Sequence, residues 1–143
     1  DCHMLADLFT ESVHTIAAAS YTPSQLASWA PIPPDYAALH TRLENLNTYV
    51  AEEDSQLVGF ISVLPPAHIE YLFTHPSCSR KGIASALYRH AIEDIVCTDR
   101  PLTVDASILS RPFFERQGWT ILKEETVERN GERFRRFRMA LSR

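Results

Sequence analysis

Residues 70–90 read E-Y-L-F-T-H-P-S-C-S-R-K-G-I-A-S-A-L-Y-R-H, and the pattern changes within this stretch from strand to helix. A strand-like run over residues 69–74 is broken at Pro76, and from Gly82 onward apolar residues recur at helical spacing. A strand, a basic glycine-containing turn and a helix start expose unpaired backbone N–H groups at the positive end of a helix dipole. The stretch therefore predicts an anion site, suited to a group such as a pyrophosphate.

The length and composition predict a single domain over residues 1–143, because 45% of the residues are hydrophobic and 22% are charged. The formal net charge of -4 argues against a nucleic-acid-binding protein driven by bulk electrostatics. Cys2, Cys78 and Cys97 are an odd and sparse set, which favours reduced thiols in a cytoplasm over a disulfide framework. Neither a membrane-spanning run nor a signal-peptide pattern is present, so we expect a cytoplasmic protein that does not associate with membranes.

The chain begins with three predicted helices: residues 3–18, a short helix that begins at the Thr22–Gln25 capping box and stops before Pro31, and a third after Pro34. The remaining predicted elements are strands at 48–53, 57–64 and 69–74, a helix from Gly82 to about Cys97, a strand at 102–106 and a short helix at 113–117. Gly59 interrupts one of these strands, and it predicts a bulge or a close approach of another element.

The C-terminal part of the chain is predicted to form a hairpin, because Asn130-Gly131 is the strongest short hairpin signal. With a two-residue turn, the cross-strand pairs are Arg129–Glu132, Glu128–Arg133, Val127–Phe134, Glu125–Arg136, Lys123–Arg138 and Leu122–Met139. Three pairs of opposite charge support this register. The arginine-rich segment 133–138 is then explained by solvated hairpin charges with glutamate partners, and a nucleic-acid patch is the alternative.

The basic turn resembles motif A of the GNAT superfamily of N-acetyltransferases, [QR]-x-x-G-x-[GA]. The matching segment is Ser79-Arg80-Lys81-Gly82-Ile83-Ala84, in which the glycine and the small sixth residue agree and Ser79 departs from the usual Gln or Arg. The run F-F-E-R-Q-G-W at 113–119 is similar to the family's F-Y-E-x-x-G-[FW]. The segments 21–30 and 102–107 resemble a bacterial branch of uncharacterised acetyltransferases. An ordinary strand-to-helix turn with solubilising cations is the alternative for the first motif.

The resemblance covers most of the chain and implies an α/β (α+β) fold. A mixed, mostly antiparallel central sheet would be flanked by helices, with the first two motifs at the strand-to-helix turn and at the last short helix. The family's usual first strand would precede residue 1, so we expect that strand to be missing from this chain or trimmed.

The resemblance also implies a site for acetyl-CoA as co-substrate. Backbone N–H groups near Phe73 and Thr74 would hold the pantetheine and acetyl groups where two strands splay apart. The residues expected to contact the cofactor are Leu72, Phe73, Thr74, Ser79, Arg80, Lys81, Gly82, Ile83, Ala84, Ser85, Ser107 and Phe114. The residues expected to bind the acceptor are Tyr21, Trp29 and Tyr36, for which core packing is the alternative.

Acetyl transfer needs a base, because only the lone pair of a deprotonated amine attacks the thioester. Glu70 is the predicted general base, acting through water, with a solvated strand-end carboxylate as the alternative; Asp105 is the second candidate. The family commonly uses a tyrosine to protonate the leaving thiolate, and Phe114 stands at that position. Tyr71 and Tyr88 are the phenols that could replace it, although Tyr88 is better explained by the apolar stripe of its helix.

The sequence predicts no metal site, because the His75-x-x-Cys78 spacing lacks a second pair of ligands. The predicted function is an N-acetyltransferase that transfers the acetyl group of acetyl-CoA to a primary amine of a small molecule or peptide, by direct attack in a ternary complex. The alternative is a non-catalytic CoA-binding sensor or partner module, which Ser79, Phe114 and the absent first strand favour. We expect no nucleic-acid partner, and a homodimer is left open.

Overall fold

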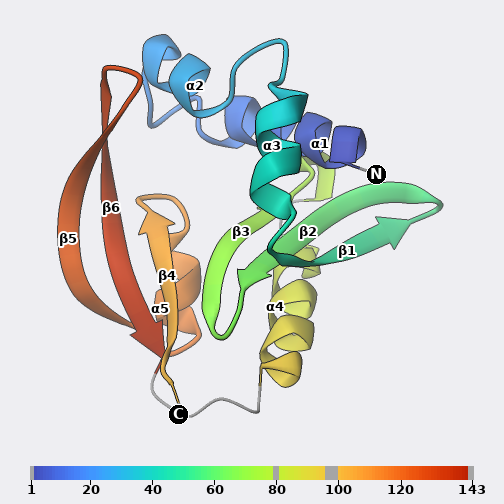
Figure 1. Cartoon of the computed structure of the whole chain (residues 1–143), viewed down its shortest axis with the longest axis vertical. Helices are drawn as coiled ribbons and strands as arrows, with labels where there is room; N and C mark the ends of the chain where they lie inside the picture. The colour runs from blue at the N-terminus through green and yellow to red at the C-terminus, as the bar shows by residue number, and fades with distance from the viewer. Residues whose placement is uncertain (1, 79–80, 96–99, 142–143) are drawn as a thin grey trace.

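The computed structural model describes residues 2–78, 81–95 and 100–141, which fold into a six-stranded sheet with helices on both faces (Figure 1). The strands are β1 (Asn47–Glu53), β2 (Gln56–Leu64), β3 (His68–Thr74), β4 (Leu102–Ser107), β5 (Thr120–Arg129) and β6 (Glu132–Leu141). The helices are α1 (Cys2–Ile16), α2 (Pro23–Trp29), α3 (Tyr36–Leu43), the 3-10 turn η1 (Pro76–Cys78), α4 (Ile83–Asp94) and α5 (Arg111–Arg116). The predicted fold class is confirmed.

The strand order is β1-β2-β3-β4-β6-β5, and every neighbouring pair is antiparallel except β3 with β4. That parallel pair needs a crossover connection, which α4 provides. The sheet is therefore two antiparallel parts, β1–β3 and β4–β6–β5, that meet along one parallel edge.

Local sequence signals set the helix ends. The predicted capping box is confirmed at α2, where Thr22 Oγ1 accepts from the N–H of Gln25 and the Thr22 N–H donates to Gln25 Oε1. At α3 the cap is Asp35, whose carboxylate accepts from the N–H of Ala38. The helix predicted to reach Cys97 ends at Asp94, because the chain leaves helical geometry at Ile95; residues 96–99 lie outside the described part.

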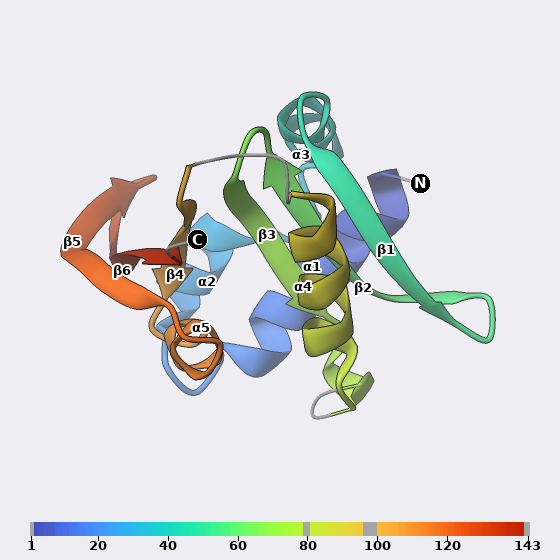
Figure 2. The same cartoon turned by 90° about the horizontal axis from the view of Figure 1, so that it is seen from below.

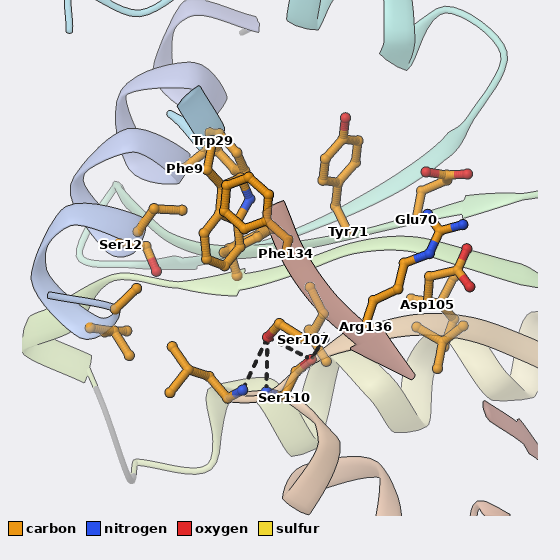
Figure 3. Close-up of a pocket in the computed structure, with 18 of the residues that line it drawn as sticks. Phe9, Ser12, Trp29, Glu70, Tyr71, Asp105, Ser107, Ser110, Phe134 and Arg136 are labelled. Carbon is orange, nitrogen blue, oxygen red and sulfur yellow. Dashed lines mark hydrogen bonds between the residues drawn. The ribbon is translucent and has the colours of Figure 1, made fainter. Parts of the chain in front are cut away.

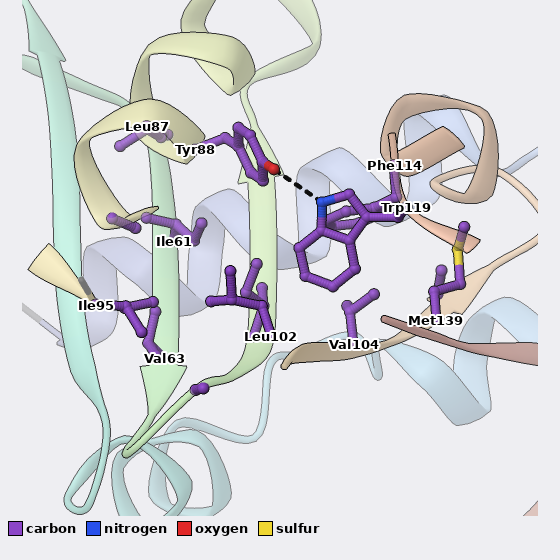
Figure 4. Close-up of a cluster of buried hydrophobic side chains, with 14 of the residues drawn as sticks. Ile61, Val63, Leu87, Tyr88, Ile95, Leu102, Val104, Phe114, Trp119 and Met139 are labelled. Atoms are coloured by element: carbon purple, nitrogen blue, oxygen red, sulfur yellow. Dashed lines mark hydrogen bonds between the residues drawn. The ribbon is translucent and has the colours of Figure 1, made fainter. Parts of the chain in front are cut away.

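Two apolar clusters hold the sheet between its helices (Figure 2). On one face, Leu87 and Tyr88 of α4 pack against Ile61 and Leu102 (Figure 4). The members of the other cluster come from α1, α2, α3 and β2, and are Leu5, Ala6, Leu8, Phe9, Val13, Ala17, Leu26, Ala30, Leu39 and Phe60. None of the helices in the described ranges is long and apolar enough to cross a membrane.

The C-terminal hairpin turns at Asn130-Gly131, where both residues have positive φ, as a primed turn requires. The predicted register is confirmed from Arg129–Glu132 through Glu125–Arg136 and at Lys123–Arg138. The predicted Leu122–Met139 pair is wrong. Ile121 pairs with Met139 and Leu122 has no partner, because a bulge adds one residue to β5 at that point.

Of the three predicted pairs of opposite charge, Glu125–Arg136 forms an ion pair among the described residues, while Arg129–Glu132 and Glu128–Arg133 face each other in the register without one. Arg136 Nε donates to Glu125 at 2.6 Å, and Arg135 pairs with Glu124. Because these ion pairs are at the surface, they contribute little to the free energy of folding. Their main effect is to neutralise part of the positive charge of β6.

Strands β3 and β4 pair only at their first residues, His68 with Thr103 and Ile69 with Val104, and then separate (Figure 1). The next residue, Glu70, is also irregular on the other edge of β3. Ser62 pairs with Tyr71 and Val63 with Ile69, which leaves Glu70 as the extra residue of a bulge. Bulges re-aim side chains and often lie beside active sites.

Gly59 lies where α4 approaches β2 closely, which confirms one of the two readings of this glycine. A Cβ atom there would lie 3.0 Å from both Ile83 Cγ2 and Leu87 Cδ1, and 3.1 Å from the carbonyl oxygen of Phe73. The absence of a side chain at Gly59 therefore allows the first turn of α4 to pack closely against the sheet.

We expect Gly59→Val to lower the free energy of unfolding by about 1–3 kcal/mol, because the added methyl groups overpack a site that already has no room for a Cβ. Gly59→Ala should cost less, since it adds one methyl group, which crowds the ends of Ile83 and Leu87 and the Phe73 carbonyl oxygen but brings no further carbon atoms. Urea denaturation of the three proteins measures the series. Equal midpoints and slopes would contradict the close approach.

Candidate active site

A cavity of about 570 Å³ opens where β3 and β4 separate. Its walls come from α1, α2, β3, β4, the β5–β6 hairpin and the first residues of α4 and α5 (Figure 3). This volume is in the range of small-molecule and cofactor sites. The cavity therefore joins segments that are far apart in the sequence, at the place where β3 and β4 stop pairing.

One end of the cavity reaches the start of α4, where Ala84 is part of the wall. Gly82 precedes this helix in the left-handed conformation, with φ at +81°, and no side chain caps the helix. The Ala86 N–H donates to the Gly82 carbonyl and the Lys81 N–H to the Cys78 carbonyl, whereas the amides of Ala84 and Ser85 have no acceptor among the described residues. An uncapped helix start of this kind can bind an anion, and the predicted anion site at the turn stays a prediction.

The residues predicted to contact the cofactor fall into three groups. Leu72, Phe73, Thr74, Ala84, Ser107 and Phe114 line the cavity. Lys81, Gly82, Ile83 and Ser85 lie at the start of α4, outside the cavity lining, and Lys81 is exposed. Ser79 and Arg80 lie outside the described residues. The positions of these twelve residues do not test their contacts with a cofactor, which stay predictions.

The turn from β4 to α5 is held by two serines (Figure 3). Ser107 Oγ accepts from the backbone N–H groups of Leu109 (3.2 Å) and Ser110 (3.1 Å), and the Ser107 N–H donates to Ser110 Oγ at 3.0 Å. Because these bonds use much of the capacity of the hydroxyl, Ser107 shapes the cavity wall as well as lining it.

Three titratable side chains meet at the first residues of the splay. His68 Nε2 lies 3.7 Å from Glu70 Oε1 and 3.8 Å from Asp105 Oδ2, while its Nδ1 hydrogen-bonds Thr103 Oγ1 at 2.7 Å. Burial lowers the pKa of His68 from its ordinary value, against the attraction of the two carboxylates. The imidazole is therefore neutral at neutral pH.

The two candidate bases differ in their partners. Asp105 accepts from Arg138 at both oxygens, at 2.6 and 3.2 Å, in a fork-shaped pair. Glu70 has no such cation among the described residues, and its side chain is 39% exposed toward the cavity. Of the two, Glu70 is the carboxylate without a Lys or Arg at ion-pair distance in the described part of the chain, and its role as base stays a prediction.

Aromatic rings cover the wall formed by α1, α2, β3 and β6 (Figure 3). The Phe9 and Phe73 rings lie 4.9 Å apart edge to face, and Trp29 lies 6.2 Å from Phe134. Tyr21 and Trp29, both predicted to bind the acceptor, belong to this wall.

Tyr36, the third residue predicted to bind the acceptor, does not line the cavity. Its ring lies 4.4 Å from the His3 ring in a tilted arrangement, and its hydroxyl donates to Asp7 at 2.7 Å. These contacts join α3 to α1, so Tyr36 is a helix-packing residue in this structure.

The two phenols considered as replacements for the missing acid have different surroundings. Tyr88 is buried and its hydroxyl accepts from Trp119 Nε1 at 2.8 Å (Figure 4), in agreement with the packing explanation. Tyr71 lines the cavity. A third phenol, Tyr21, lies nearer the β4–α5 turn: burial raises its pKa, and hydrogen bonding with the Ile108 backbone and the Ser107 side chain acts in the opposite direction.

His75 and Cys78 do not form a metal site with the residues around them. His75 Nε2 lies 3.2 Å from Glu11, its Nδ1 interacts with Ser77, and Cys78 is buried. In the described part of the chain, no three His, Cys, Asp or Glu side chains are grouped so that they could hold a metal ion.

Among the lining residues that sequence reasoning did not place in this site are His68, Arg42 and Arg129. For His68 a signal existed, since it is two residues before Glu70 in a strand and so close to the predicted base. For Arg42 and Arg129 there was none, because only the tertiary fold brings the end of α3 to the end of β5.

The chain was compared with known proteins. The sequence model of a family described as "Acetyltransferase (GNAT) domain" matches residues 17–141. The chain is 37% identical over 139 residues to an uncharacterised N-acetyltransferase, YafP, of Escherichia coli K12, and the match covers 97% of this chain and 88% of that protein.

Solved structures give the same picture of the fold. A GCN5-related N-acetyltransferase from Rhodopseudomonas palustris superposes with a TM-score of 0.93 at 29% identity, covering 99% of this chain and 89% of the other. The PaiA N-acetyltransferase of Thermoplasma acidophilum, solved in complex with coenzyme A, superposes with a TM-score of 0.76 at 18% identity, covering 100% and 93% of the two chains.

Proposed function

Because the chain belongs to the GNAT acetyltransferase family, we propose that it transfers the acetyl group of acetyl-CoA to a primary amine of a small molecule or peptide. The reaction would be a direct attack in a ternary complex, within one domain over residues 1–143. The observation that carries the proposal is the cavity itself, which connects an uncapped helix N-terminus to an unneutralised carboxylate. A cofactor and an acceptor can enter it from different sides and meet at the splay.

Acetyl-CoA would bind with its pyrophosphate on the first amides of α4 and its pantetheine along β3. Beyond Ile69 the edge of β3 that faces β4 has no strand partner in the described part of the chain, so its backbone groups can bond a ligand amide. A PaiA N-acetyltransferase of the same fold holds coenzyme A in its crystal structure, which supports a CoA-type cofactor here. Phe113 and Phe114 would cover the acyl end and exclude water.

Glu70 would take the proton from the attacking amine, directly or through a water. The bulge at Glu70 interrupts the regular alternation of side chains along β3 and so sets the direction of this carboxylate. His68 lies beside it, and because burial lowers the pKa of His68, the imidazole adds no positive charge that would lower the basicity of Glu70. The nitrogen lone pair then attacks the thioester carbonyl carbon, the tetrahedral intermediate collapses, and the CoA thiolate leaves. A β3 amide at the splay would stabilise the developing oxyanion.

The proton for the leaving thiolate would come from Tyr21. Its phenol lies on the cavity wall at the β4–α5 turn, near Phe114, and its raised pKa keeps it protonated at neutral pH. A thiol with a pKa of about 8.5 is a tolerable leaving group without an acid, so this step assists the reaction and is not essential to it.

We expect Tyr21→Phe to lower turnover at neutral pH by roughly tenfold, less than the full range of acid catalysis, because the thiolate can depart unprotonated. Binding of acetyl-CoA should change little. Tyr36→Phe is the matched control, since it removes the same hydroxyl from a tyrosine outside the cavity. Equal turnover of Tyr21→Phe and the parent, with a loss in Tyr71→Phe, would assign the acid to Tyr71.

The alternative is a CoA-binding module without turnover, which Phe114 favours because it replaces the usual acid with a side chain that is 1% exposed and carries no proton. Release of free thiol from acetyl-CoA across a panel of amines separates the two. An amine-dependent release above the hydrolysis background supports the transferase. CoA binding in calorimetry without release from any amine supports the module.

A further inference from the structure

Two arginines on the cavity wall have no acidic partner, in contrast to their neighbours. Arg135 and Arg136 also line the cavity, and each is paired with a glutamate. Within residues 2–78, 81–95 and 100–141, no carboxylate lies at ion-pair distance from the guanidinium of Arg42 or Arg129. We propose that Arg42 and Arg129 bind an anionic group, a carboxylate or a phosphate, of the acceptor amine.

The two side chains come from separate elements and face the same space. Arg42 lies in the last turn of α3 and Arg129 is the last residue of β5, yet both line the main cavity and an adjoining cavity of about 210 Å³. They therefore stand where the two cavities meet. A guanidinium from each side suits fork-shaped recognition of a carboxylate or a phosphate.

The position of Arg129 is built into the fold. Ser28 Oγ donates to the Arg129 carbonyl at 2.7 Å, and Gln25 Nε2 donates to the Arg133 carbonyl at 2.9 Å. These bonds from α2 hold the end of the hairpin over the cavity. The backbone that carries the Arg129 guanidinium is thus held in place by hydrogen bonds.

The surroundings of Arg129 disfavour its positive charge on balance. Desolvation lowers the pKa of Arg129, the charge of Arg42 acts in the same direction, and Tyr71 and Glu70 oppose them. Two like charges near one another in a partly dry site repel, and a bound anion relieves that repulsion. Asp35, which also lines the smaller cavity, already accepts from the N–H of Ala38.

The cofactor is not the expected source of this anion. Arg42 belongs to α3, whose core residue Leu39 packs on the face of the sheet opposite α4, the helix of the proposed pyrophosphate site (Figure 2). Tyr71 and Glu70 are consecutive residues of β3 that line the cavity together with the two arginines, and both act on the charge of Arg129. An acceptor with its anion on the arginines would extend along β3 and place its amine at the proposed base.

This inference rests on the proposed function, and one kinetic series tests both. The probes are ω-amino acids of increasing chain length with their carboxamides, and O-phosphoethanolamine with ethanolamine. We expect kcat/KM for the anionic member of the best pair to exceed that of the neutral member by roughly 10- to 100-fold, the effect of a hydrogen bond to a charged group. The two probe sets distinguish a carboxylate from a phosphate.

Arg42→Gln and Arg129→Gln should each remove most of this preference through KM, with kcat for the neutral amine unchanged. Arg133→Gln is the matched control, because it removes an exposed cation from the same hairpin outside both cavities. Thermal unfolding of the variants separates lost binding from lost packing. Turnover of amines with no preference for the anionic member overturns the inference and leaves the proposed function standing.

If no amine is turned over, the proposed function fails, and a binding measurement still decides the arginine pair. In the CoA-saturated protein, the Nε–H resonances of Arg42 and Arg129 should shift on titration with 6-aminohexanoate or O-phosphoethanolamine, while that of Arg133 should not. Unmoved Arg42 and Arg129 resonances with every anionic probe, up to millimolar concentration, would overturn the anion site itself.

Discussion

Glu70→Gln is expected to lower turnover at neutral pH by roughly 10²-fold or more while the affinity for CoA persists. The amide keeps the shape of the side chain but cannot accept the proton of the attacking amine. The assay is thiol release from acetyl-CoA with any amine that supports it, and calorimetry measures CoA binding in the same variant. A fall in turnover without a fall in binding assigns the loss to chemistry.

Two variants sharpen this test. Glu53→Gln, at the exposed end of β1, makes the same change in charge away from the cavity and should leave turnover at the parent level. Asp105→Asn breaks the fork-shaped pair with Arg138, so its effect should appear mainly as lower stability. Full turnover in Glu70→Gln together with none in a folded Asp105→Asn protein would place the base on β4.

Glu70 could be proposed as the base from the sequence alone, but its surroundings could not be predicted. The sequence indicated this carboxylate because it lies in a short strand that precedes the motif A turn. The bulge that directs it depends on the pairing of β3 with β2, and that pairing has no local signal. The same limit produced the wrong Leu122–Met139 pair, since one unpaired residue shifts every later partner.

Elements specified by local chemistry were predicted well. The capping box at Thr22 and the Asn130-Gly131 turn are each determined by a few consecutive residues, and both are as expected. Tyr36 shows the opposite case. Its type and position before the strands suggested an acceptor site, but α3 begins at Tyr36 and turns the ring toward His3. A helix orientation is set by packing, which a single sequence does not display.

The second large expected effect concerns CoA binding at the turn before α4. Gly82→Glu is expected to weaken CoA binding by roughly 100-fold or more, because the new carboxylate would face the pyrophosphate at the amides that are proposed to hold it. A Cβ at Gly82 meets nothing within 4 Å, so the substitution adds charge without a clash. The positive φ makes any side chain there somewhat strained, and that cost needs a control of its own.

Gly131→Glu provides that control. Gly131 also has a positive φ, of +79°, and open space around its Cβ position, so it carries the same strain and the same added charge at the hairpin turn, far along the chain from α4. Gly82→Ala separates the strain from the charge at the site itself. Calorimetric titration with CoA should rank the affinities of the parent and Gly131→Glu as equal, Gly82→Ala as slightly weaker and Gly82→Glu as weakest. If a folded Gly82→Glu protein binds CoA as tightly as Gly131→Glu does, the pyrophosphate is held elsewhere, and the uncapped start of α4 is only the end of a helix.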